Sequence, residues 1–359
     1  MLTATVLAGC GAGTGPVAHS DSDSDSWESL PRGWSALEAS PFAGTNAVSV
    51  WTGKELFYWG GNTDYDETQH AGSALYDPSA RTWRRISNGP LGGRSWAGAA
   101  WTGKKVFIWG WWRNGPAELA DGALFDPASE TWRMLPPSPL SPRAPIAVVW
   151  TGREVLVWGD ANTSAGSQQR EGAAFDPSSG SWRMLPDAPR GLNLGHGIWT
   201  GEELIVFGAL LDGNNFSATE NAIGMAYDPE AGSWRLIAPS RLSPQASGIA
   251  WTGSEMLAFD YELAAGAYDP TRDRWRDAGR IPLRFSECGP EGIRTGELIV
   301  AWFCGWGATY DISGRSWRRM SEASGELVYS GRPVSAGDVV LFVGAADDGG
   351  RNHFCAFRP

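Results

Sequence analysis

Hydrophobic positions along this chain recur as short alternating runs separated by polar, glycine-rich stretches. Residues 150–186 contain one complete unit, in which an apolar run ends in Trp-Thr-Gly and a second run, 155–158, follows at once. A polar loop leads to a third run ending in Phe175-Asp176-Pro177, and a fourth short run carries Trp182. Runs of about four to eight residues bounded by Gly, Pro and Asp are typical of β-strands joined by tight turns. Each unit is therefore predicted to form four short antiparallel strands.

The unit repeats at fixed spacing along the chain. In all seven copies an apolar residue follows eight positions after the first residue of the Trp-Thr-Gly turn or of its degenerate form, and these first residues are Trp51, Trp101, Trp150, Trp199, Trp251, Arg294 and Ser335. Six copies also carry an aromatic residue with a tryptophan seven positions later, namely Trp83, Trp132, Trp182, Trp234, Trp275 and Trp317. A period of about 40–50 residues indicates a propeller or an array, and four strands per unit make one propeller blade.

The two ends of the repeat region predict how the ring closes. The last unit, from Pro333 to Phe357, contains three strands and lacks the tryptophan strand, whereas Trp34 lies in a spare strand ahead of the first unit. We predict that this N-terminal strand completes the last blade, because the pairing leaves no open sheet edge between the first and last blades. The sequence thus predicts an all-β, seven-bladed β-propeller over residues 27–359.

The repeat resembles the kelch motif of the galactose oxidase-like propellers. The resemblance covers residues 34–359 and rests on the glycine after the second strand, the polar loop, and the fixed distance from an aromatic residue to a tryptophan. The double glycine that kelch units usually carry is present here only as Gly60-Gly61. Galactose oxidase binds copper through His and Tyr side chains. In this chain only His196 is placed on an inner strand, so we expect no metal site and no other cofactor.

The start of the chain has its own resemblance. Leu7-Ala8-Gly9-Cys10 is similar to a bacterial lipobox, which implies that residues 1–9 are a truncated signal peptide and that Cys10 carries lipid. Residues 10–26 are rich in Gly, Ser and Asp, as in a flexible tether. No Lys or Arg precedes Cys10, so an unprocessed segment with a chance cysteine is the alternative. With the lipid, the protein would be an extracytoplasmic lipoprotein that contacts the membrane through its anchor alone.

Composition narrows the partners further. The formal net charge is −11 and Lys and Arg are scattered, which argues against nucleic acid as a partner. No apolar run reaches the roughly 18 residues of a membrane-spanning helix.

Cys288 and Cys304 flank one predicted hairpin at nearly opposite positions, which predicts a disulfide, with two buried thiols as the alternative. Cys355 would then be unpaired and buried in the last unit, and we expect a monomer.

Two groups of residues are candidates for binding a ligand. The loops between the second and third strands are long in the first four units only, and Trp111, Trp112 and Arg113 in one of them add aromatic and cationic groups that suit a sugar or a peptide. Alternatively, these three residues pack over the neighbouring blade. The second group lies near the start of each inner strand and predicts a polar ring around the channel: Arg94, Arg143, His196, Glu287 and Arg332. The alternative role of the arginines is to tie neighbouring blades by hydrogen bonds.

These observations lead to two hypotheses of function. The first is a non-catalytic binding module for a glycan, a peptide or an envelope protein. It rests on the lipobox, the tether, the unequal loops and the lack of a recognisable catalytic motif. The second is a carbohydrate-active enzyme, epimerase- or mutarotase-like or oxidase-like, with its site at the channel mouth. No residue of the sequence is marked out as catalytic by a motif.

Overall fold

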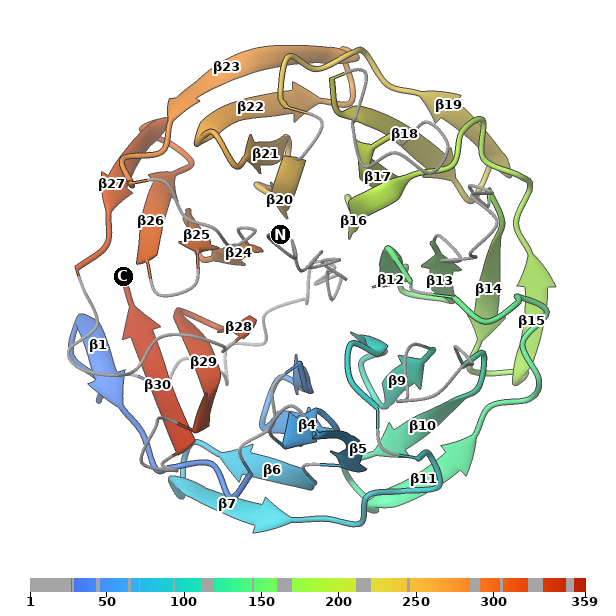
Figure 1. Cartoon of the computed structure of the whole chain (residues 1–359), viewed down its shortest axis with the longest axis vertical. Coiled ribbons are helices and arrows are strands. Elements are labelled where there is room, and N and C mark those ends of the chain that lie inside the picture. The colour runs from blue at the N-terminus through green and yellow to red at the C-terminus, as the bar shows by residue number, and fades with distance from the viewer. Residues whose placement is uncertain are drawn as a thin grey trace, which may run out of the picture.

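Seven four-stranded antiparallel sheets form a ring around a common axis (Figure 1). The computed structural model describes residues 27, 29–42, 46–63, 66–70, 72–92, 94–110, 119–143, 145–159, 170–210, 221–243, 246–284, 291–303, 306–321, 332–346 and 352–359. This arrangement confirms the predicted all-β, seven-bladed propeller. No helix in the described ranges is long and apolar enough to cross a membrane.

Each blade is ordered from an innermost strand a to an outermost strand d. The first four blades are β2 (Val48–Trp51), β3 (Leu56–Trp59), β6 (Ser73–Asp77) and β7 (Thr82–Arg85); β8 (Gly98–Trp101), β9 (Val106–Trp109), β10 (Gly122–Asp126) and β11 (Thr131–Met134); β12 (Ala147–Trp150), β13 (Val155–Trp158), β14 (Gly172–Asp176) and β15 (Ser181–Met184); and β16 (Asn193–Trp199), β17 (Leu204–Ala209), β18 (Ile223–Asp228) and β19 (Ser233–Leu236). A small two-stranded sheet, β4 (Asn62–Thr63) and β5 (Asp66–His70), lies between β3 and β6 in the chain.

The remaining three blades follow the same plan. They are β20 (Ala246–Trp251), β21 (Met256–Asp260), β22 (Ala264–Asp269) and β23 (Arg274–Arg280); β24 (Glu291–Thr295), β25 (Leu298–Phe303), β26 (Trp306–Asp311) and β27 (Ser316–Arg319); and β28 (Arg332–Ala336), β29 (Val339–Ala346), β30 (Asn352–Arg358) and β1 (Gly33–Ala36). The alternating direction of the strands gives the ring two faces. We call the face with the b–c and d–a connections the loop face, and the face with the a–b and c–d turns the turn face.

The turns are encoded by a few residues at fixed positions. In the first blade Thr52 Oγ1 accepts a hydrogen bond from the Glu55 N–H at 3.0 Å and donates one to the Glu55 carbonyl at 2.8 Å, while Gly53 has a φ of 87°. The same threonine contact recurs in four further blades, at Thr102, Thr151, Thr200 and Thr252. A glycine reaches this positive φ without steric cost, so the Thr-Gly pair sets the a–b turn locally.

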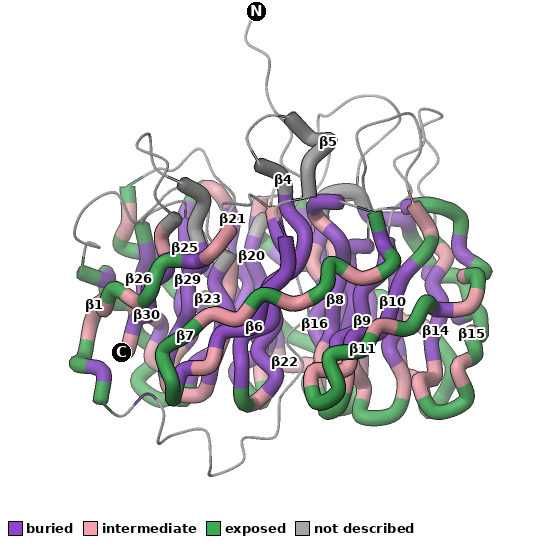
Figure 2. The backbone as a smooth tube through the Cα atoms, turned by 90° about the horizontal axis from the view of Figure 1, so that it is seen from below, coloured by how far each residue is buried: buried purple, intermediate pink, exposed green. Residues whose placement is uncertain are grey.

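The hydrophobic core lies between the blades. Strand b is buried along its length, as in β13, where Val155, Leu156, Val157 and Trp158 are all fully buried. Trp158 packs in a cluster that extends to Tyr227 of the next blade. Exposed positions are concentrated on the outermost strands and on the turns (Figure 2). Each blade therefore buries its two faces against its neighbours.

The strand-d tryptophans join each blade to the one before it. Every indole N–H donates to a backbone carbonyl within strand d of the preceding blade or just beyond its end, over donor–acceptor distances of 2.8–3.1 Å. The pairs are Trp34 with Ser321, Trp83 with Glu38, Trp132 with Ser87, Trp182 with Pro136, Trp234 with Pro186, Trp275 with Ala238 and Trp317 with Ala278. The seven links repeat one geometry around the ring.

The N-terminal strand closes the ring as predicted. β1 pairs with β30 in register from Gly33 opposite Arg358 to Ala36 opposite Cys355. The Trp34 ring lies about 5 Å from those of Phe342 and Phe357, with centroid distances of 5.1 Å to each. Cys355 is buried and has no disulfide partner in the described part of the chain, and burial raises the pKa of its thiol to about 12.

We expect Trp34→Phe to lower the free energy of unfolding by about 1–2 kcal/mol, because it removes the bond to the Ser321 carbonyl and part of the buried ring. Urea denaturation followed by tryptophan fluorescence and circular dichroism measures the loss. Trp306→Phe is the control, since Trp306 is 44% exposed on β26 and should be nearly neutral. Equal stabilities of the two variants would contradict this role for Trp34.

Candidate functional site

One residue of each inner strand pairs with the residue that lies eight positions after the start of the Trp-Thr-Gly turn. These seven register-equivalent residues, which we call the inner-strand ring, are Val48, Gly98, Ala147, His196, Gly248, Glu291 and Arg332. They share one level of the propeller, in the half of strand a that is nearer the loop face. Ionisable residues occupy the positions of the fourth, sixth and seventh blades, and glycine, alanine or valine occupies the others.

His196 and Glu291 are both half-buried at this level. Side chains alternate along a strand, so His196 lies on the same side of β16 as Ile198, which packs between the fourth and fifth blades. Glu291 likewise lies on the side of Ile293, which packs between the sixth and seventh blades. The inner-strand ring thus carries an imidazole beside the seam of the fourth and fifth blades and a carboxylate beside the seam of the sixth and seventh. Both groups can accept and donate protons.

Glu291 was missed by the sequence analysis, which chose Glu287 instead. The missing signal was available as spacing, because Glu291 precedes Trp302 by eleven residues, as His196 precedes Phe207. Arg332 has the predicted place at the start of β28, and its side chain is not described. Several other predicted residues lie outside the described residues: Trp111, Trp112, Arg113 and Glu287, together with Cys10, Cys288 and Cys304.

Arg94 is buried and joins the first blade to the second. Its guanidinium binds the Asp121 carboxylate, with Nη1 2.8 Å from Oδ1 and Nη2 3.2 Å from Oδ2, and Nη1 also donates to the Gly110 carbonyl at 3.5 Å. The Arg94 carbonyl accepts a bond from the Gly61 N–H of the first blade at 3.1 Å. Gly110 and Asp121 begin and end the b–c connection of the second blade, so Arg94 holds the base of that connection.

Arg143 repeats this arrangement one blade later. Its Nη1 donates to the carbonyls of Gly159 at 3.4 Å and Glu171 at 3.2 Å, and its Nη2 lies 2.8 Å from Glu171 Oε2. The side chains of Arg94 and Arg143 are 1% and 0% exposed. Their contacts match the alternative in which the arginines tie blades together, and ligand binding by them stays a prediction.

In the fifth blade a buried carboxylate, in place of a buried arginine, holds the base of the b–c turn. Asp260, at the end of β21, is buried, and its Oδ2 accepts a bond from the Ser243 N–H at 2.9 Å. Its Oδ1 accepts one from the Ala264 N–H at 3.0 Å. A buried charge is tolerated only when hydrogen bonds replace its hydration, as they do here. Asp260 therefore accepts hydrogen bonds from the backbone of both the short b–c turn and the d–a connection.

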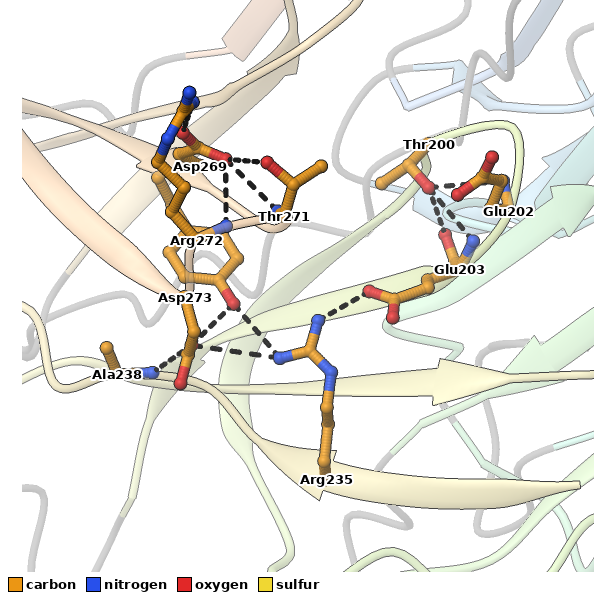
Figure 3. Close-up of polar contacts among 10 residues, drawn as sticks. Thr200, Glu202, Glu203, Arg235, Ala238, Asp269, Thr271, Arg272 and Asp273 are labelled. Atoms are coloured by element: carbon orange, nitrogen blue, oxygen red, sulfur yellow. Dashed lines mark hydrogen bonds and ion pairs between the residues drawn. The ribbon is translucent and has the colours of Figure 1, made fainter. Parts of the chain in front are cut away.

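A second set of charges ties the outer strands together. Arg235 on β19 binds Glu203 of its own blade, with Nη2 2.7 Å from Oε2, and donates from Nη1 to the Tyr268 hydroxyl of the next blade at 3.0 Å (Figure 3). Tyr268 in turn donates to Asp273 Oδ1 at 2.7 Å, and burial raises the pKa of its hydroxyl. Arg276 repeats the pattern with Glu255, Nε to Oε1 at 2.9 Å, and with the Tyr310 hydroxyl. These charges stabilise the seams between blades.

Candidate metal ligands do not gather in the described part of the chain. It contains no group of three or more His, Cys, Asp or Glu side chains that could hold a metal ion. His196 lies on strand a of the fourth blade and His353 on strand c of the seventh, so the two described imidazoles belong to different blades.

Comparison with known proteins supports the fold. No protein-family model and no curated protein matches the sequence. Among solved structures, the chain is similar to a fungal alcohol oxidase of the AA5 family determined in complex with copper. The identity is 12% and the TM-score 0.67, over 91% of this chain and 76% of the oxidase. At this identity the likeness shows the shared propeller fold.

The comparison corrects the first hypothesis of function. A non-catalytic binding module was expected, yet a solved protein that shares this fold over 91% of the chain is an enzyme. The sequence hypothesis failed because it took the lack of a known catalytic motif as evidence against catalysis. In a propeller, a site can be assembled from single residues on separate blades, which leaves no contiguous motif. The second hypothesis, of an enzyme, fits the comparison better.

We expect Arg143→Met to lower the free energy of unfolding by about 2 kcal/mol, because the Gly159 and Glu171 carbonyls lose their donor and Glu171 loses its partner. Thermal and urea unfolding measure the change. Arg153→Met, at an exposed turn arginine, is the matched control and should stay within about 0.5 kcal/mol of the parent. An unchanged free energy of unfolding in Arg143→Met would show that the contacts of Arg143 with Gly159 and Glu171 are dispensable for stability.

The Arg276–Glu255 pair predicts a pH dependence of stability. Hydrogen bonding to Arg276 lowers the pKa of Glu255 from its ordinary value of 4.5. A depressed folded-state pKa contributes stability above about pH 4.5, and this contribution is lost as the pH falls through the folded-state pKa. The difference in melting temperature between the parent and Glu255→Gln should therefore be largest near neutral pH and shrink in acid. Glu230→Gln, at an exposed turn, should show no such trend.

Proposed function

We propose that this protein is an enzyme that acts on a hydroxyl-bearing carbon of an alcohol or a carbohydrate, with its site at the loop-face end of the inner strands. The observation that carries the proposal is the inner-strand ring, where His196 and Glu291 stand at one level on separate blades. Valine, glycine and alanine occupy that level on the first three blades and glycine on the fifth, so the ionisable groups are confined to the other three blades. The likeness to an alcohol oxidase adds support.

The roles of the residues follow from their chemistry. His196 would accept the proton of a substrate hydroxyl, since a neutral imidazole is an effective general base near neutral pH. Glu291 would hydrogen-bond a second hydroxyl or return the proton to the product. Arg332 would stabilise the negative charge that develops on the substrate oxygen. A base that takes the anomeric hydroxyl proton and an acid that protonates the ring oxygen are sufficient for sugar mutarotation, which is redox-neutral. Alcohol oxidation would in addition need an acceptor for the hydride of the carbon, which these three residues do not supply.

Copper is the cofactor of the similar fungal enzyme, and the described residues were tested for a site that fits it. They hold no cluster of three candidate ligands, and the buried tyrosines Tyr268 and Tyr310 bond to arginines at the blade seams. The described residues therefore do not fit a copper centre, and no step through copper is derived. Proton transfer by His196 and Glu291 requires no metal.

We further propose that the repeat is of the kelch type and that Cys10 carries a lipid anchor outside the cytoplasm. The support is the repeat spacing for the first and the lipobox-like Leu7-Ala8-Gly9-Cys10 for the second. If the protein is an enzyme as proposed, its principal partner is its substrate. The rim residues Trp111, Trp112 and Arg113 remain candidates for contacting its sugar rings. Mass spectrometry of the protein from its native membrane, beside Cys10→Ala, tests the anchor.

The activity is tested by incubating the purified protein with a panel of aldoses, uronic acids and primary alcohols. Hydrogen peroxide formation, with and without added copper, reports oxidation, and proton NMR exchange between anomers or epimers reports the non-redox reaction. We expect His196→Gln and Glu291→Gln to lower kcat/KM by about 10²–10⁴-fold, the usual contribution of a general acid or base.

The controls for this assay are His353→Gln and Glu230→Gln. These residues are a histidine on strand c of the seventh blade and a glutamate in an exposed turn, away from the inner-strand ring. Both variants should keep the parent activity. Parent activity that survives in His196→Gln and Glu291→Gln would remove the ring from the reaction, and no turnover of any substrate in the panel would overturn the proposal.

A further inference from the structure

An open groove of about 470 Å³ runs along the outer strand of the third blade. One wall is β15, and the other is the connection that leaves the second blade, with Pro136, Pro137 and Pro139. β15 forms the outer rim of its blade (Figure 1). The groove is therefore on the outside of the propeller and is independent of the inner-strand ring.

The backbone of β15 has one edge without a partner in the described chain. The Leu185 N–H donates to the Gly172 carbonyl at 2.8 Å, in register with the rest of the β14–β15 pair. In an antiparallel pair the backbone groups of alternate residues point toward the partner strand. Those of Arg183 therefore point toward β14, whereas the N–H and C=O groups of Trp182 and Met184 point away from the sheet. Such an edge can accept one more strand.

The side chain at the end of β15 does not protect this edge. Met184 lies two residues after the strand-d tryptophan and is 43% exposed. On the first, fifth and sixth blades the same position carries a charge, in Arg85, Asp277 and Arg319. Charged side chains on outer strands hinder the addition of further strands, and β15 lacks this hindrance.

An unpaired guanidinium lies at one end of the groove. On four blades the arginine after the strand-d tryptophan is bound by a glutamate four positions after the start of the Trp-Thr-Gly turn. In the second blade Lys105 takes the place of that glutamate, and Arg133 makes no ion pair or hydrogen bond within the described chain. Arg133 lies instead against Gly180, which lines the groove, and a Cβ on Gly180 would be only 2.6 Å from Nη2. Arg133 is thus available to a carboxylate that enters the groove.

We propose that, in addition to the activity proposed above, this groove binds an extended acidic segment of a partner protein as a strand antiparallel to β15. The backbone of the segment would bond to the outward groups of Trp182 and Met184. Two apolar side chains, two residues apart, would enter the groove beside these residues, because alternate residues share a face of a strand. The C-terminal end of an antiparallel segment lies toward Gly180, so an acidic residue two positions further along would meet Arg133.

Fluorescence polarisation of the full chain with labelled hexapeptides tests the proposal. The peptides are Thr-X-Thr-X-Thr-Glu, in which both X residues are Val, Ile, Phe or Tyr. We expect saturable binding of at least one peptide. Replacement of its glutamate by lysine should weaken binding at least tenfold, since the lysine would face Arg133. Methylation of both X nitrogens should also weaken it at least tenfold, because it removes the donors of the added strand.

Two variants test the protein side of the groove. Met184→Lys and Arg133→Glu should each weaken binding of the best peptide at least tenfold, and Arg133→Glu should now favour the peptide that carries lysine. Both side chains are exposed, so the melting temperature should stay that of the parent. The matched controls are Leu236→Lys, at the same position on the fourth blade, and Arg153→Glu, at an exposed turn. Both controls should bind like the parent.

Four results would overturn the proposal. They are the failure of every peptide to bind, parent-like binding by Met184→Lys or Arg133→Glu, undiminished binding of the methylated peptide, and an equal loss in the control variants. Sedimentation of the parent without peptide tests the other occupant of such an edge. Self-association that Met184→Lys abolishes would assign the groove to a second copy of this chain and would likewise overturn the proposal.

Discussion

The whole ring depends on the hydrogen bond from each outer-strand indole to a carbonyl of the preceding blade. A single four-stranded blade leaves both of its faces apolar, so it is stable only when packed between neighbours. The tryptophan meets two requirements of that packing at once, because its ring covers apolar surface and its N–H finds a fixed acceptor. The hydrogen bonds from Trp34 to Ser321 and from Trp83 to Glu38 are of this same type, and they join the blades where the two ends of the repeat region meet. The closure is thus another copy of the ordinary blade junction.

Packing between blades also determines how the charged side chains are paired. Polar groups that fall at a seam must be paired, and Arg94, Arg143 and Asp260 are buried with nearly every bond directed to backbone or carboxylate groups. The outer arginines are engaged in a similar way by glutamates and tyrosines, as Arg235 is by Glu203 and Tyr268. The inner-strand ring differs from these seams, because His196 and Glu291 bring ionisable groups to a level where most blades have glycine, alanine or valine.

The inner-strand ring departs from the repeat at three of its positions. Most inner-strand ring positions are small because neighbouring inner strands converge on the axis, and a Cβ on Gly98 would lie 2.3 Å from a Val148 methyl group. Ionisable residues at three of these positions are therefore departures from the packing rule, and a functional role accounts for departures of this kind.

Sequence spacing by itself determined the strand count, the turn chemistry, the number of blades and the closure, because each depends on contacts within one unit or on a count of units. The Thr-Gly turns and the strand-d tryptophans act locally and identically in every copy, so their period carries the fold. Side-chain partners were decided by the tertiary structure. Arg94 and Arg143 were expected near an open channel, and they lie buried against the bases of the b–c connections. The contact between the Arg358 guanidinium and the Leu30 carbonyl, across 328 residues of sequence, was likewise decided by the closure of the ring. A repeat fixes where its units go, but the chemistry at a site depends on which unlike residues the ring brings to the same level.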